Sequence, residues 1–165
     1  MPSERTSQYI DEKRKAKSLR FMDRPYDQAQ MRVSTDRYIS REFQEREREA
    51  IWMKVWQFAG RADELPNAGD WKEHRIFDQS YIIVRGRDGK LRGFVNVCPH
   101  RGNTLCVGGK GHSGVLVCPF HNWTFELDGR LRGIARPELV GPVNKGELGL
   151  PTVSVDTWAG FIFIN

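Results

Sequence analysis

Two short segments of the sequence contain the residue types that bind transition metals. The first is Cys98-Pro-His100 and the second is Cys118-Pro-Phe-His121, with 17 residues between His100 and Cys118. Each segment pairs one thiolate donor with one imidazole donor, and each directly follows a predicted strand that ends in valine. Two turns of a β scaffold that face each other would therefore supply two sulfur and two nitrogen ligands.

The mixed pairing of ligand types distinguishes between two metal centres. Tetrahedral zinc accepts two Cys and two His, but its usual spacing pairs Cys with Cys and His with His. A Rieske [2Fe–2S] centre needs two Cys on one iron and two His on the other, so each loop gives one ligand to each iron. The spacing favours the Rieske centre and leaves zinc as the alternative. Unliganded Cys and His are a weaker explanation, because all four residues lie in predicted turns.

The elements expected to hold these turns are almost all β-strands. Residues 66–69 break the chain, and short runs rich in aromatic and β-branched residues follow. Asp-Gly pairs at 88–89 and 128–129 predict tight turns between such runs. This pattern predicts a mainly β fold, an antiparallel β sandwich or small barrel. We expect strands over Trp71–Phe77, Tyr81–Arg85, Leu91–Val97, Trp123–Leu127, Arg130–Arg132, Thr152–Val155 and Phe161–Ile164, and a loop over Gly133–Leu150.

The first 50 residues differ in charge from the rest of the chain. They hold 22 charged side chains, whereas the remaining 115 residues hold 25. A charged tail is expected over residues 1–37, an amphipathic helix over 38–56 and the β domain over 57–165. Within the helix, the periodic pattern runs from Ser40, the predicted N-cap, to Trp56, and the apolar face comprises Phe43, Ala50, Ile51 and Val55.

Composition and charge exclude several classes of protein. With 165 residues, 39% of them hydrophobic and 28% charged, the chain fits one domain plus an appendage. No stretch approaches the ~18 apolar residues of a membrane-spanning helix, and the N-terminus lacks the apolar run of a secretion signal. The net charge of +5 comes from largely interleaved charges, so no nucleic-acid partner is expected. Three cysteines cannot form a disulfide framework, which favours a reducing, cytoplasmic location.

The two Cys/His loops resemble the cluster-binding motifs of Rieske proteins, and more narrowly those of the large (alpha) subunit of Rieske-type ring-hydroxylating oxygenases. The resemblance extends from about residue 38 to residue 165, through the segments IWMKVWQFAG, RADELPNAGDW, CPHRGNTLC, CPFHNWTFELDGRL and WAGFIFIN. It implies a [2Fe–2S] cluster whose buried iron is held by Cys98 and Cys118, and whose outer iron is held by His100 and His121.

Two neighbours of His121 also bear on this resemblance. Trp123 resembles the tryptophan of the family that packs beside the cluster. Asn122 stands where the family commonly has glycine, and we expect it to alter the local turn without abolishing binding.

The resemblance implies one-electron transfer in an oligomeric oxygenase. A ferredoxin or an NADH-dependent reductase would reduce the cluster, and a mononuclear iron would then activate O₂ to hydroxylate an aromatic ring. That iron is held by two His and one carboxylate. Outside the two loops only His74 and His112 remain, 38 residues apart. We therefore expect the mononuclear Fe(II) to belong to a catalytic domain absent from this chain, and the 165 residues alone to hydroxylate nothing.

Two other functions remain open. A stand-alone Rieske ferredoxin would carry electrons without a substrate, but such proteins lack a long charged helical N-terminus, so the segment before residue 57 favours the oxygenase. A zinc-stabilised binding module would hold the same four side chains and would be colourless.

Several further features have structural interpretations. Residues 109–114 match G-x-G-x-x-G, but the strand-like Val115–Val117 follows in place of a helix, so a mobile loop is expected and not a dinucleotide site. Cys106 is expected to pack as a small apolar side chain and Arg101 to buttress the first loop. His74 and His112 are expected to be structural or to face solvent.

The loop residues also predict the reduction potential. High-potential Rieske proteins, which resemble this motif, add a disulfide between the loops and a serine that donates to a sulfide. Here Phe120 occupies the place of the second-loop cysteine, Cys106 has no disulfide partner, and Asn122 and Trp123 offer no hydroxyl. The potential is therefore expected toward the negative end of the range of about −150 to +300 mV.

Overall fold

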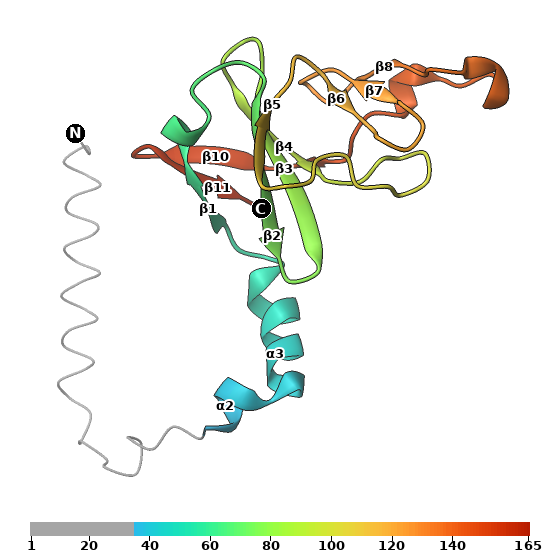
Figure 1. The fold of residues 1–165 in the computed structure, drawn as a ribbon. Helices are drawn as coiled ribbons and strands as arrows, with labels where there is room; N and C mark the ends of the chain where they lie inside the picture. Colours follow the sequence, from blue (N-terminus) through green and yellow to red (C-terminus); the bar gives the residue numbers. More distant parts are fainter. Residues whose placement is uncertain (1–34) are drawn as a thin grey trace, which may run out of the picture. The chain divides into compact units, whose positions relative to one another are not determined.

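The computed structural model describes residues 35–165 of the chain (Figure 1). Most of the charged tail expected over residues 1–37 lies outside the described residues. The chain divides into two compact units, one up to Arg46 and one from Glu47 to Asn165. All strands that the structure describes belong to the second unit, which therefore positions the Cys/His segments.

A helical segment precedes the strands. It comprises α2 (Asp36–Ile39), α3 (Arg41–Glu47) and a π-helical turn over Arg48–Trp52. The Ser40 hydroxyl accepts a hydrogen bond from the Phe43 amide at 3.2 Å, as a helix N-cap does. None of the helices in the described part of the chain is long and apolar enough to cross a membrane.

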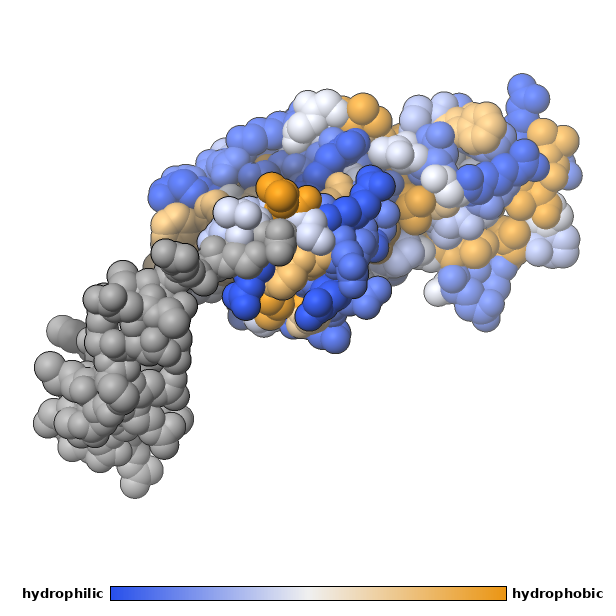
Figure 2. Space-filling model, turned by 90° about the horizontal axis from the view of Figure 1, so that it is seen from below, coloured by the Kyte–Doolittle hydropathy of each residue, from blue (hydrophilic) through white to orange (hydrophobic). Residues whose placement is uncertain are grey.

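The helix is shorter than the sequence pattern predicts, and its apolar face is not buried. Helical structure ends at Trp52 and not at Trp56. Ile51 and Val55 remain 47% and 43% exposed. The π-helical turn hydrogen-bonds one residue further along the chain than an α-turn does, which moves the following side chains off the predicted α-helical face. Apolar side chains are exposed at other points of the surface as well (Figure 2).

Three antiparallel sheets confirm the predicted fold class (Figure 1). Their strand orders are β1-β11-β10, β5-β2-β3-β4-β9 and β6-β7-β8. The strands are β1 (Gln57–Arg61), β2 (Asp70–Ile76), β3 (Gln79–Arg85), β4 (Leu91–Val95), β5 (Lys110–His112), β6 (Leu116–Val117), β7 (Thr124–Phe125), β8 (Leu131–Gly133), β9 (Thr152–Val153), β10 (Val155–Trp158) and β11 (Phe161–Ile164).

The sequence pattern does not predict β1 or β5. β1 contains a register shift between Phe58 and Gly60, and Gly60 has a φ of 125°, so the strand lacks regular alternation. β5 is the short stretch Lys-Gly-His, paired with β2 through Asp70 and His112. In both cases pairing with a neighbouring strand stabilises a segment whose own residues give no strand signal.

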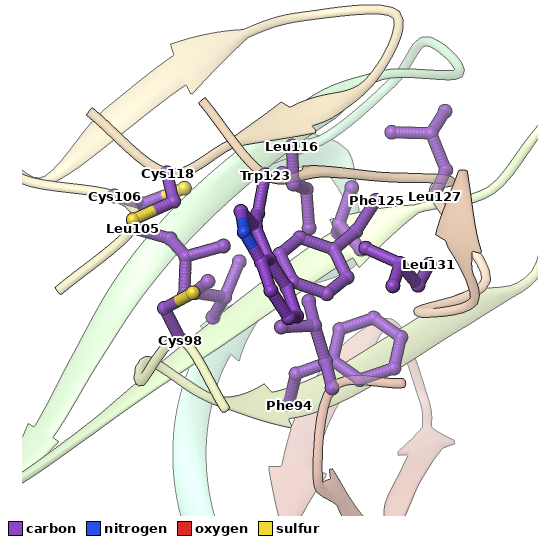
Figure 3. Packing of buried hydrophobic residues seen from close by; sticks show 13 residues of the cluster. Phe94, Cys98, Leu105, Cys106, Leu116, Cys118, Trp123, Phe125, Leu127 and Leu131 are labelled. Atoms are coloured by element: carbon purple, nitrogen blue, oxygen red, sulfur yellow. The ribbon is translucent and has the colours of Figure 1, made fainter. Parts of the chain in front are cut away.

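β3 separates two hydrophobic cores. Ile82 and Val84 belong to one core and Ile83 to the other, because successive side chains of a strand point to opposite faces of the sheet. The larger core also contains the buried Cys98 and Cys118 (Figure 3). Each fully buried aliphatic side chain stabilises the fold by about 1.5–3 kcal/mol. The cysteines of both Cys/His segments are therefore anchored in the larger core.

The connections agree with the predicted turns. Gly89 and Gly129 of the two Asp-Gly pairs have φ angles of 76° and 87°, and backbone hydrogen bonds of 2.8 and 2.9 Å close the hairpins around them. The predicted loop over Gly133–Leu150 contains two short 3₁₀ turns, Pro137–Leu139 and Lys145–Glu147.

Candidate metal centre

The first Cys/His segment forms a self-closed turn between β4 and β5. The Cys98 amide donates to the Asn103 carbonyl at 2.8 Å, and the Gly102 amide donates to the Cys98 carbonyl at 2.9 Å. Gly102 has a φ of 70°, which glycine adopts without strain. Residues 98–103, the first cluster loop, thus fold back on their own backbone.

The second segment, between β6 and β7, repeats the same backbone pattern. The Cys118 amide donates to the Trp123 carbonyl at 2.8 Å, and the Asn122 amide donates to the Cys118 carbonyl at 2.9 Å. Asn122 stands at the position of Gly102 and has a φ of 56°. Asparagine is the non-glycine residue that tolerates this conformation best, so the turn expected to change is preserved. Residues 118–123 are the second cluster loop.

The fold brings the four predicted ligands together. Cys98 and Cys118 are free thiols, 2% and 1% exposed, in the same core (Figure 3). The rings of His100 and His121 meet at 4.7 Å between centroids, inclined by 71°. The Asn103 amide of the first loop also approaches the Cys118 sulfur at 3.9 Å. The two loops therefore face each other.

The two imidazoles share one feature. The Nδ1 atoms of both His100 and His121 are buried and have no hydrogen-bond partner within the protein. Leaving a buried polar atom unpaired costs about 1–3 kcal/mol, so such atoms are rare in native folds. Two of them, in the same two loops as two buried thiols, form a donor set that fits a metal centre.

The protonation states also suit metal binding. Burial raises the pKa of the Cys98 thiol to about 11, so this thiol is neutral near pH 7 until a metal displaces its proton. Burial and then the neighbouring charges of His121 and Arg101 lower the pKa of His100. A neutral imidazole is the form that coordinates a metal.

The four donors fall into two pairs, the buried thiols of Cys98 and Cys118 and the imidazoles of His100 and His121. Among residues 35–165, no group of three or more His, Cys, Asp or Glu side chains is arranged to hold a single metal ion. In a two-iron cluster each iron takes only two protein ligands, which is compatible with two separate pairs of donors.

Aromatic side chains flank both imidazoles. The Trp123 indole, 2% exposed, stacks on His100 with 4.7 Å between centroids and 6° between planes. The ring centroids of Phe120 and His121 lie 3.8 Å apart, and Phe120 is 58% exposed. Both imidazoles border a surface hollow of about 410 Å³, whose other wall is formed by Ile134, Ala135, Arg136, Leu139 and Val140.

The other residues considered from the sequence have different surroundings. His112, in β5, bonds the Asp70 carboxylate at 2.7 Å, and no helix follows residues 109–114. His74 is half-buried in β2. Cys106 is buried in the same core as the two predicted cysteine ligands and packs as a small apolar side chain. Arg101, expected to buttress the first loop, is exposed at the rim of the hollow.

Sequence reasoning misses Asn96, whose side chain bonds the segment directly after the first cluster loop. Asn96 is 3% exposed and hydrogen-bonds the backbone of Leu105 and Cys106. The available signal is an amide side chain between Val95 and Val97, at the end of the predicted strand Leu91–Val97.

Comparison with known proteins gives consistent matches. Residues 55–146 match the family model of the Rieske [2Fe-2S] domain. The carnitine monooxygenase oxygenase subunit of Escherichia coli (strain K12) is 40% identical over 121 residues, which are 73% of this chain and 32% of that protein. The glycine betaine monooxygenase oxygenase subunit of Pseudomonas aeruginosa is 39% identical over 128 residues, which are 78% and 30%. The chain thus spans about a third of the length of these curated relatives.

Solved structures agree with these matches. A quaternary ammonium Rieske monooxygenase in complex with L-carnitine superposes with a TM-score of 0.73 at 37% identity, over 79% of this chain and 37% of that one. Naphthalene 1,2-dioxygenase from Rhodococcus sp. bound to indole superposes with a TM-score of 0.71 at 31% identity, over 75% and 29%.

Proposed function

This chain belongs to the Rieske [2Fe–2S] domain family, and on that premise we propose that Cys98 and Cys118 bind one iron of its cluster while His100 and His121 bind the other. The observation that carries the proposal is the pair of buried Nδ1 atoms without partners. Coordination through Nδ1 would satisfy both atoms at once and would leave Nε2 of each ring for a hydrogen bond with a partner.

The bound cluster supplies a one-electron couple. The side chains of this protein would surround the cluster on two sides. The core around Cys98 and Cys118 excludes water from the sulfur side. Trp123 and Phe120 hold the imidazoles from their faces. The imidazoles border the surface hollow, so a partner protein can approach their edges there.

We propose that the chain acts as the Rieske part of an oxygenase alpha subunit. The identities of 38–41% to oxygenase subunits of carnitine and glycine betaine monooxygenases support this role. In that role, a ferredoxin or an NADH-dependent reductase delivers electrons, and a catalytic domain with a mononuclear iron consumes them, within an oligomer and in the cytoplasm. One related quaternary ammonium monooxygenase is described with inter-subunit electron transfer, which supports an oligomeric pathway.

Two substrate classes are represented among the relatives. The resemblance to ring-hydroxylating enzymes implies an aromatic compound, and 2-aminobenzenesulfonate 2,3-dioxygenase, 34% identical, belongs to that class. The carnitine and glycine betaine enzymes share higher identity, which favours a quaternary ammonium compound as substrate of the whole protein. Oxygen uptake with each class, measured on a protein that also contains the catalytic domain, separates the two.

Iron and sulfide analysis tests the proposed cluster. The chain purified without oxygen should contain two irons and two acid-labile sulfides, and reduction should give the rhombic EPR signal of a His-ligated cluster. Equimolar zinc without sulfide would instead support the zinc module. Reading the gene beyond Asn165 distinguishes the oxygenase subunit from a stand-alone Rieske ferredoxin, because only the former continues into a domain with a two-His, one-carboxylate motif.

A further inference from the structure

Asn96, 3% exposed, is the one polar or charged residue that is buried as a whole among the residues the structure describes. It follows β4 and stands two residues before Cys98. The corresponding residue before Cys118 is Leu116, an apolar side chain that is 1% exposed. The two cluster loops, alike in their backbone bonds, thus differ in how the chain enters them.

The Asn96 amide makes every hydrogen bond it can make. Its Oδ1 accepts from the amides of Leu105 at 3.1 Å and Cys106 at 2.9 Å. Its Nδ2 donates to the Cys106 carbonyl at 2.7 Å and to the Ser80 hydroxyl at 3.0 Å. An amide side chain has two acceptor and two donor positions, so none is left unsatisfied.

These bonds join the two ends of the segment that carries Cys98 and His100. Asn96 lies at the start of this segment, and Leu105 and Cys106 lie at its end. Three bonds from one side chain therefore close residues 97–104 into a loop of fixed span.

A chain of hydrogen bonds also anchors this closure to the large sheet. The backbone amide of Asn96 donates a hydrogen bond to the backbone carbonyl of Ser80 in β3 at 2.9 Å. The Ser80 hydroxyl in turn donates to the Glu73 carboxylate of β2 at 2.7 Å. The Glu73 side chain is 8% exposed and also accepts from Arg75 at 2.7 Å. A connected network of this kind is rigid when every member is satisfied.

We propose that Asn96 is a positioning residue for the cluster, which sets the place of Cys98 and His100 relative to the sheet through Ser80 and Glu73. The proposal rests on the proposed function, because it assigns the network to the loop that would hold one Cys and one His ligand. Outer partners of this kind typically change metal affinity by about 10–100-fold when they are removed.

The variant Asn96→Leu tests the proposal in the full chain loaded with its cluster. It gives the first loop the residue type, leucine, that stands at the matching position before the second loop. Iron release to a chelator should be about tenfold or more faster than in the wild type, and the EPR g values should shift. Ile162→Ala, in the other core, is the control: it destabilises the fold without touching the loop. Its iron release and EPR spectrum should match the wild type at a temperature well below unfolding.

Ser80→Ala gives a second test that keeps the two Oδ1 bonds of Asn96. Hydrogen–deuterium exchange of the peptide over residues 97–106 should become faster in this variant than in the wild type, while exchange in β11 stays unchanged. Equal iron release by Asn96→Leu and Ile162→Ala, or equal exchange in Ser80→Ala and the wild type, would overturn the proposal. A wild-type chain without iron and sulfide would instead overturn the proposed function, and this proposal with it.

Discussion

The indole of Trp123 lies parallel to the imidazole of His100, with 6° between the planes and 4.7 Å between the centroids. The two residues come from different cluster loops. Because Trp123 is only 2% exposed and packed in the core, its ring holds the imidazole in one orientation. This orientation keeps Nδ1 of His100 buried.

Trp123→Ala should therefore damage both the fold and the cluster. Loss of the buried indole should lower the free energy of unfolding by about 3–5 kcal/mol, as for other large-to-small core substitutions. Trp123→Phe, which retains an aromatic face against His100, should keep most of the iron. Denaturant unfolding and iron content measure the two effects, and a Trp123→Ala chain with wild-type iron content would refute the role of the stack.

The three cysteines provide a matched comparison. Cys98, Cys118 and Cys106 are all buried in one core, but only the first two lie in a Cys/His loop. Cys98→Ala and Cys118→Ala should each abolish the cluster and its visible absorption. Cys106→Ala should retain both, because Cys106 lies outside the two Cys/His loops and burial raises the pKa of its thiol to about 12. Loss of colour in the Cys106 variant would contradict the proposed ligand set.

The reduction potential should lie toward the negative end of the Rieske range of about −150 to +300 mV. Cys106 is a free thiol, so no disulfide joins the loops, and Asn122 and Trp123 after His121 offer no hydroxyl to stabilise the reduced cluster. Protein-film voltammetry at pH 7 measures the midpoint. A value above about +100 mV would place the chain with high-potential Rieske proteins.

Two glycines in similar turns should respond differently to alanine. Gly89 and Gly129 both have positive φ, 76° and 87°. A Cβ at Gly89 meets nothing within 4 Å, whereas a Cβ at Gly129 would meet the ring of Phe94. Gly89→Ala should cost about 1–2 kcal/mol from backbone strain alone. Gly129→Ala should cost about 1–3 kcal/mol more from overpacking. Thermal unfolding of the two variants measures the difference. Equal costs would show that the Phe94 ring moves aside without loss of stability.

Glu64 should make stability depend on pH in the acidic range. Hydrogen bonds from Lys110, the Arg61 amide and Lys72 lower its pKa from 4.5 to about 2. A lowered folded-state pKa stabilises the fold above pH 4.5, and this contribution is lost as the pH falls toward 2. Glu64→Gln should therefore be less stable than the wild type near neutral pH, by up to about 1 kcal/mol.

The two stability curves should converge as the pH approaches the folded-state pKa. Chemical unfolding of the iron-free chain between pH 7 and pH 3 measures this without interference from loss of the cluster. A constant gap between wild type and Glu64→Gln across that range would exclude the ion pairs as its cause.

The candidate site was more predictable from the sequence than the elements around it. The spacing of Cys98, His100, Cys118 and His121 indicates the kind of metal centre, because few metal centres use mixed Cys/His pairs in two turns. The β class followed from local signals such as the turns at Gly89 and Gly129.

Features that depend on pairing or on distant partners were not predictable. β1 exists because β11 pairs with it across a bulge, and the segment itself has no alternating pattern. The helix ends at Trp52 through a π-helical turn that no periodicity indicates. Asn96 lies within the predicted strand Leu91–Val97, and its role is not visible in the sequence, because its partner Ser80 lies 16 residues away and meets it only in the fold.

The self-closed form of the two cluster loops has a consequence for protein engineering. Each six-residue segment, 98–103 and 118–123, is shaped by two hydrogen bonds within its own backbone. Two such segments, grafted onto facing hairpin ends of another antiparallel scaffold, should therefore keep their backbone conformation. Asn96 lies outside the grafted segments, so the host scaffold would have to supply the hydrogen bonds that its side chain makes to Leu105 and Cys106.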